Sequence, residues 1–72
     1  MTEKEYYDWF ERHGFKRSGE GTILTEECSD KQGTFIVAPR PSVLSPAGRE
    51  AAINRMAEYL GIGRSPGGGG VH

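Results

Sequence analysis

The sequence has a single cysteine, Cys28, so it cannot form a disulfide within the chain. No Cys or His spacing resembles that of a zinc site, and we expect neither a metal nor a cofactor. No apolar run approaches the ~20 residues needed to span a bilayer, which predicts no membrane association. The first ten residues are charged and aromatic, unlike a signal peptide. These absences favour a reducing, cytoplasmic setting.

An excess of positive charge is also missing. Nine Lys and Arg residues stand against ten Asp and Glu residues, which gives a formal net charge of −1. Domains that bind nucleic acid by neutralising phosphates are usually basic. The charge balance therefore favours a protein partner and leaves RNA as the alternative partner.

The 72 residues suffice for one small domain. Thr2 and Glu5 have the spacing of a capping box, which predicts a helix over residues 3–13 that Gly14 closes. Four residues at helical spacing form one face of this helix: Tyr6, Trp9, Phe10 and His13. We expect its three aromatic residues to belong to the core and Tyr7, which lies off this face, to be exposed.

Three β-favouring runs follow, at residues 15–17, 22–27 and 34–38. Polar, glycine-containing turns separate them at residues 19–21 and 29–33. Because both turns are too short for a crossover connection, the runs predict a three-stranded antiparallel meander.

Two prolines, Pro39 and Pro41, are expected to end the third strand, because proline lacks a backbone N–H. We expect Val43 and Leu44 to pack beneath the core. Ser45 followed by proline then begins a second helix.

The buried face of this second helix is predicted from four apolar residues: Ala52, Ile53, Met56 and Leu60. Gly61 is expected to end the helix in a Schellman motif, with Ile62 folded back over Ala57. Residues 63–72 include four consecutive glycines and predict a flexible tail.

The predicted fold class is therefore α+β, a single domain over residues 1–62. It is a two-layer αβββα arrangement in which a three-stranded antiparallel sheet packs against two helices. The second face of the sheet is expected to stay open to solvent or to a partner.

Short motifs along this order resemble the HicA family of mRNA-cleaving toxins, whose fold is like a double-stranded-RNA-binding domain. The segment "HGF" (residues 13–15) follows the first helix, and "RSGEGTIL" (17–24) occupies the place of the family's "GSHH" turn. The segments "FIVAPRPSVLSPAG" (35–48) and "YLGI" (59–62) are similar to the family's third strand, loop and closing residues. The likeness covers about residues 5 to 62.

The resemblance implies RNA cleavage by a histidine in the turn before the second strand. In this sequence that position falls on Gly21 or Thr22, neither of which can transfer a proton at neutral pH. His13 is the remaining candidate for a general base. We interpret it instead as a helix-end histidine that the helix dipole favours.

Five residues are predicted to bind a partner: Arg12, Lys16, Arg17, Glu20 and Arg40. The basic members can share one surface and meet phosphate or an acidic partner. In that case their charges affect binding and hardly affect folding. The competing interpretation is that these charges only confer solubility.

Adjacent Glu26 and Glu27 point to opposite faces of a strand, so they cannot act as a paired acid and base. We interpret both as part of a solvated edge. Neighbouring carboxylates would raise the pKa of the Cys28 thiol, and packing as a small apolar residue explains Cys28 better than nucleophilic chemistry.

The sequence thus predicts a small, non-catalytic, cytoplasmic binding module that covers a site on a protein partner. Regulators or inhibitors of this kind occur in phages and mobile elements, as HicA-like proteins do. The alternative is a HicA-like toxin that binds or cleaves RNA.

Overall fold

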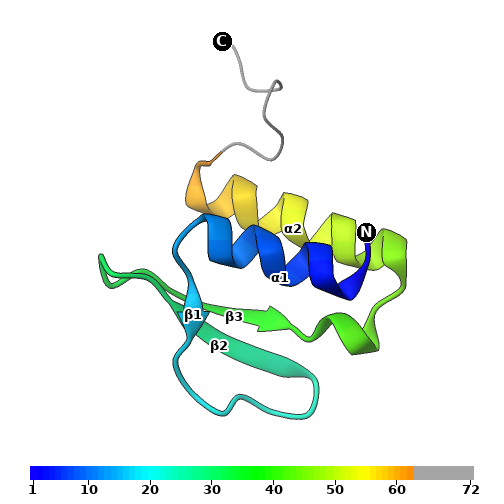
Figure 1. Cartoon of the computed structure of the whole chain (residues 1–72), viewed down its shortest axis with the longest axis horizontal. Helices are drawn as coiled ribbons and strands as arrows, with labels where there is room; N and C mark the ends of the chain where they lie inside the picture. The colour runs from blue at the N-terminus through cyan, green and yellow to red at the C-terminus, as the bar shows by residue number, and fades with distance from the viewer. Residues whose placement is uncertain (63–72) are drawn as a thin grey trace, which may run out of the picture.

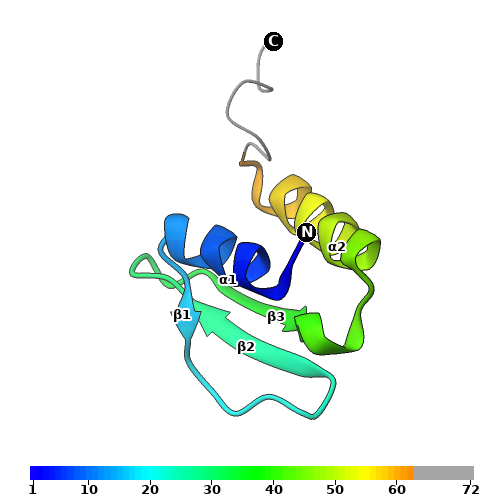
Figure 2. The same ribbon diagram turned by 45° about the vertical axis from the view of Figure 1, so that its right-hand side comes forward.

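The chain folds in the order helix, three strands, helix, as the sequence predicts, and the computed structural model describes residues 1–62. The elements are α1 (Glu3–Arg12), β1 (Lys16–Arg17), β2 (Thr25–Ser29), β3 (Phe35–Pro39), the 3₁₀ helix η1 (Pro41–Val43) and α2 (Pro46–Leu60). Figures 1 and 2 show both helices on the same side of the sheet. The α+β prediction is confirmed, whereas the tail predicted at 63–72 lies outside the described residues.

The predicted capping box forms at the start of α1. The Glu5 N–H donates to Thr2 Oγ1 at 3.1 Å, and the Thr2 N–H donates to Glu5 Oε1 at 2.7 Å. The helix ends at Arg12, one residue earlier than predicted, because His13 leaves the helical conformation. Gly14 follows with a φ of 82°, a left-handed value that glycine adopts without strain.

The three strands form one antiparallel sheet in the order β1-β2-β3. The register pairs Glu27 with Val37 and Ser29 with Phe35, while Lys16 of β1 pairs with Ser29. The predicted meander is therefore correct, and β3 lies at one edge of the sheet.

The second strand begins at Thr25, not at Thr22 as predicted. The Thr22 hydroxyl accepts hydrogen bonds from the N–H groups of Leu24 and Thr25 at 3.1 and 3.0 Å. This local turn competes with the extended conformation, as threonine side chains often do. Ile23 and Leu24, expected in the strand, are consequently exposed in the loop before β2.

The core lies between the sheet and the helices. It contains Tyr6, Trp9, Phe10, Phe15, Cys28, Ile36, Ala38, Ile53 and Ala57. Ala57 is fully buried although the sequence did not place it on the inner face of α2. Val43 is exposed, contrary to prediction, because the turn of η1 buries Pro41 in its place and Leu44 only in part.

Both ends of α2 follow the sequence signals. Ser45 Oγ accepts from the Gly48 N–H at 3.0 Å, and Pro46 occupies the first turn. At the other end Gly61 has a φ of 72°, and the Ile62 N–H donates to the Ala57 carbonyl at 2.9 Å. That bond closes the predicted Schellman motif.

Candidate functional site

The five residues predicted to bind a partner do not share one surface. Lys16 pairs with Ser29, whereas Arg17 pairs with the buried Cys28, so the two basic side chains leave opposite faces of the sheet. Arg17 and Arg40 meet on the helix-covered side. Arg12 lies elsewhere, and Glu20 contacts Arg40 through its backbone carbonyl. The binding role of all five residues stays a prediction.

Glu26 organises the basic residues on the helix-covered side. Its side chain is buried, and its carboxylate accepts from Arg17 Nη2 at 3.2 Å and lies 3.4 Å from Arg40 Nη1. The Tyr7 hydroxyl of α1 donates a second hydrogen bond to this carboxylate. The prediction that Glu26 belongs to a solvated edge is therefore wrong. The two hydrogen bonds and the ion pair with Arg40 offset the free energy that burying a carboxylate would otherwise cost.

The arginine partners of Glu26 differ in exposure. The Arg17 side chain remains 60% exposed, while that of Arg40 is 26% exposed. A groove of about 450 Å³ passes over this cluster between α1 and β1, with Phe10 and Phe15 in its wall. Replacing Arg17 by glutamate would place a carboxylate against Glu26 and would disturb folding as well as any binding.

The Arg40 side chain binds the loop between β1 and β2. Its Nε donates to the Thr22 carbonyl at 2.8 Å, and its Nη2 donates to the Glu20 carbonyl at 3.1 Å. With Nη1 beside Glu26, the guanidinium has a contact on each nitrogen. The loop is thereby held against the end of β3, and Glu20 contributes its backbone, not its exposed side chain.

Gly21 and Thr22 have structural tasks in the same loop. Gly21 has a φ of 68°, and a Cβ atom there would lie 2.3 Å from the Thr25 carbonyl oxygen. Thr22 is the turn residue described above. The positions at which the resemblance implies a catalytic histidine are therefore both occupied by residues that build the loop.

Three side chains around Glu26 have altered acidity. Burial, assisted by the carboxylate of Glu26, raises the pKa of Tyr7 to about 12. Burial also raises the pKa of Tyr6, whose hydroxyl donates to the Pro39 carbonyl at 2.6 Å. The pKa of the Cys28 thiol is raised by burial and by Glu26. A thiol with a raised pKa is a poor nucleophile at neutral pH, which agrees with a packing role.

His13 packs on an aromatic ring and lines a small pocket that also includes Asp30. Its ring packs against the indole of Trp9, with 4.7 Å between ring centroids. Among residues 1–62, no other side chain forms a hydrogen bond or an ion pair with it.

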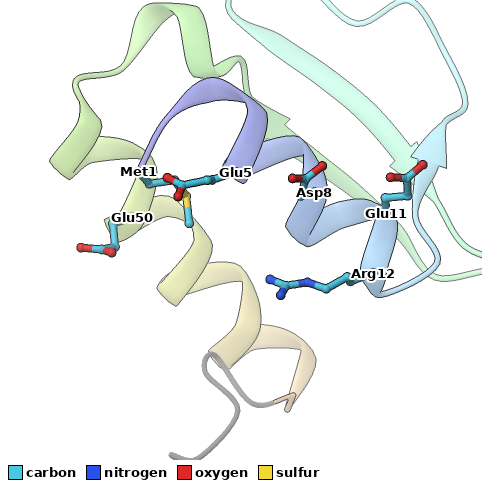
Figure 3. A pocket seen from close by; sticks show the side chains of 6 residues that line it. All are labelled: Met1, Glu5, Asp8, Glu11, Arg12 and Glu50. Carbon is cyan, nitrogen blue, oxygen red and sulfur yellow. The ribbon is translucent and has the colours of Figure 1, made fainter.

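Arg12 lies in a separate pocket of about 610 Å³ between α1 and α2. Figure 3 shows the side chains that line it: Met1, Glu5, Asp8, Glu11, Arg12 and Glu50. Glu5 belongs to the capping box, and Asp8 pairs with Lys4 at 2.9 Å. Within the described chain, no group of three or more His, Cys, Asp or Glu residues could hold a metal ion.

The open face of the sheet carries two exposed apolar side chains that sequence analysis did not single out. Phe35 and Val37 are 55% and 56% exposed and point away from the helices, opposite to the buried Ile36 and Ala38. We call Phe35 and Val37 the open-face pair. The nearly continuous apolar run of β3 was the available signal, because a strand with one open face normally alternates apolar and polar residues.

Polar residues flank the open-face pair on the side of β2. Lys16 and Ser29 lie in the same row of the sheet as Phe35, and Glu27 lies beside Val37.

No helix in residues 1–62 is both long and apolar enough to cross a membrane. The chain matches no protein-family model, no curated protein and no solved structure. The resemblance to the HicA family therefore stays a hypothesis.

Proposed function

We propose that this chain is a small, non-catalytic, cytoplasmic binding module that covers a site on a protein partner, in the manner of a phage or mobile-element regulator or inhibitor. The contact surface in this proposal is the open face of the sheet. One observation carries it: the open-face pair exposes more than half of two adjacent apolar side chains. Exposed apolar patches with polar rims are typical of protein interfaces.

The arrangement of charge supports a protein partner over RNA. Arg17 and Arg40, two of the candidate phosphate contacts, are paired with Glu26. Lys16 adds one positive charge to the open face, and Glu27 opposes it there. A surface that binds RNA by charge would be expected to leave its cations unpaired.

The geometry around the candidate catalytic residues supports a non-catalytic role. Gly21 and Thr22 shape the loop, and His13 packs on Trp9. The RNA-cleaving alternative rests on the family resemblance and on the αβββα order that it implies. It would require His13 to act as the base although no side chain among residues 1–62 forms a hydrogen bond or ion pair that orients its ring.

The proposal is tested by affinity capture from a lysate of the organism that encodes the chain. We expect the double variant Phe35→Ser, Val37→Ser to lose a partner that the unmodified protein retains. Tyr59→Ser is the matched control, because Tyr59 is an exposed aromatic residue on α2. Capture of the same proteins by the double variant would contradict the open face as the contact surface.

A parallel incubation with mRNA tests the alternative. We expect no cleavage. Cleavage that disappears in His13→Ala would overturn the binding-module proposal and support the toxin-like function instead.

A further inference from the structure

The backbone groups of β3 alternate between its neighbour β2 and the free edge of the sheet. The Arg40 N–H donates to the Leu24 carbonyl at 2.9 Å, and the Asp30 N–H donates to the Thr34 carbonyl at 3.1 Å. These bonds flank the ladder between β2 and β3 and fix its alternation. The even-numbered residues of β3 therefore direct their N–H and C=O groups toward β2.

The odd-numbered residues of β3 face outward. Phe35 and Val37 together present two N–H and two C=O groups at the edge, and no other strand among residues 1–62 pairs there. Pro39 has no N–H to offer, and its carbonyl accepts from the Tyr6 hydroxyl. The unpaired part of the edge is thus confined to Phe35 and Val37.

The other edge of the sheet, formed by β1, is protected against pairing with a further strand. There β1 has only two residues, both basic, and short, charged edge strands discourage pairing with further strands. The β3 edge carries no charged side chain between Phe35 and Pro39. The difference makes β3 the edge at which a further strand can add.

We infer that a second copy of this chain adds to the β3 edge and forms a symmetric antiparallel dimer. The register centred on Ile36 places Phe35 of each copy opposite Val37 of the other. Each facing pair exchanges two backbone hydrogen bonds, so both outward N–H groups and both outward carbonyls of each copy are satisfied. Pro39, which cannot donate, then faces only the turn residue Gly33 of the other copy.

This self-complementary register is the reason to favour a second copy over an unrelated strand. Shifting the two-fold axis to Val37 would place Phe35 opposite Pro39, whose missing N–H leaves the Phe35 carbonyl unpaired. Shifting the axis to Phe35 would place Val37 opposite Gly33, whose φ of 89° is not extended. The register centred on Ile36 avoids both defects.

The dimer joins two three-stranded sheets into one and leaves the open faces of both copies on the same side. The open-face pairs then meet across the axis, with Phe35 beside Val37 of the other copy. The inference does not depend on the proposed function, because the edge can pair whether or not the open face binds a partner.

Amide hydrogen exchange on the unmodified protein tests the inference directly. Exchange at Phe35 and Val37 should slow as the protein concentration rises from about 10 µM to about 1 mM, because dimerisation follows mass action. Ile36 and Ala38 are the internal controls, since the ladder to β2 protects them at every concentration. Exchange at Phe35 and Val37 that is fast and independent of concentration would overturn the dimer.

Sedimentation over the same range provides the second measurement. The average mass should rise toward twice the chain mass of 7.9 kDa. Val37→Pro removes an N–H that faces away from β2 and should keep the protein monomeric, whereas Val37→Thr retains that N–H and should still dimerise. Equal dimerisation of a folded Val37→Pro variant would place the interface elsewhere. If that variant does not fold, the exchange experiment decides.

Discussion

At the scale of single residues, Glu26 links α1, β1 and the end of β3 through one carboxylate. We expect Glu26→Gln to lower the free energy of unfolding by about 1–3 kcal/mol, because it weakens the charged hydrogen bonds from Tyr7 and Arg17 and removes the ion pair with Arg40 in a buried site. The Arg17 side chain is largely exposed, so solvent weakens its ion pair with Glu26. We therefore expect a loss of stability near the lower end of this range.

Chemical denaturation of Glu26→Gln and Glu27→Gln side by side checks this expectation. Glu27 is the adjacent residue on the opposite, open face, so its substitution should change stability by no more than about 0.5 kcal/mol. A loss of no more than about 0.5 kcal/mol in Glu26→Gln as well would show that the Glu26 cluster does not stabilise the fold.

The raised pKa of Tyr7 predicts that the stability of the fold depends on pH in the alkaline range. Its pKa is raised from 10.0 to about 12 by burial and by Glu26, so folding favours the neutral phenol. The associated stability is complete below pH 10 and is lost as the pH rises from 10 to about 12. Tyr6, whose pKa is also raised, acts in the same direction.

The comparison of Tyr7→Phe with the unmodified protein isolates the contribution of Tyr7. The variant should lose stability less steeply over this pH range and should lack the phenol that ionises near pH 12 in an ultraviolet titration. An unchanged titration curve would contradict the contact with Glu26.

At the scale of elements, the loop between β1 and β2 depends on Gly21. We expect Gly21→Ala to destabilise the protein by more than about 1 kcal/mol, because it adds a close contact with the Thr25 carbonyl to the strain of a left-handed residue. Gly33→Ala is the matched control. Gly33 also has a positive φ, but a Cβ there would contact nothing within 4 Å.

Thermal melts of the two glycine variants measure the difference. The Gly21 variant should melt at a clearly lower temperature than the Gly33 variant. Similar melting temperatures would indicate that the loop can move away from the Thr25 carbonyl and that the close contact at position 21 does not limit stability.

At the scale of the whole molecule, the two layers depend on Trp9. It is 1% exposed and belongs to the same core cluster as Ile53 of α2, in agreement with its predicted place in the core. We expect Trp9→Ala to cost ~3–5 kcal/mol, a large part of the ~5–15 kcal/mol that stabilises a typical domain. Little folded protein should remain at physiological temperature.

Trp9→Phe provides the control for this prediction. The indole N–H of Trp9 has no hydrogen-bond partner within residues 1–62, so phenylalanine removes a buried donor that contributes nothing. Circular dichroism melts should therefore rank Trp9→Phe well above Trp9→Ala. A melt of Trp9→Ala within a few degrees of the unmodified protein would contradict the core assignment.

Local signals in the sequence determined most of the fold. The caps at Thr2, Ser45 and Gly61 depend on hydrogen bonds between residues at most five positions apart, so the residues themselves specify them. The short turns likewise determined the antiparallel order of the strands. The start of β2 was mispredicted because the Thr22 turn competes with strand propensity over only a few residues.

Only the tertiary structure decided what the charged residues do. Glu26 meets Tyr7 and Arg17 across sequence separations of 19 and 9 residues, and no local pattern distinguishes it from Glu27. The packing of α1 against the sheet buries one of these glutamates and leaves the other on the open face. The same packing leaves the open-face pair exposed, because both helices cover one side of a sheet whose third strand is apolar on both faces.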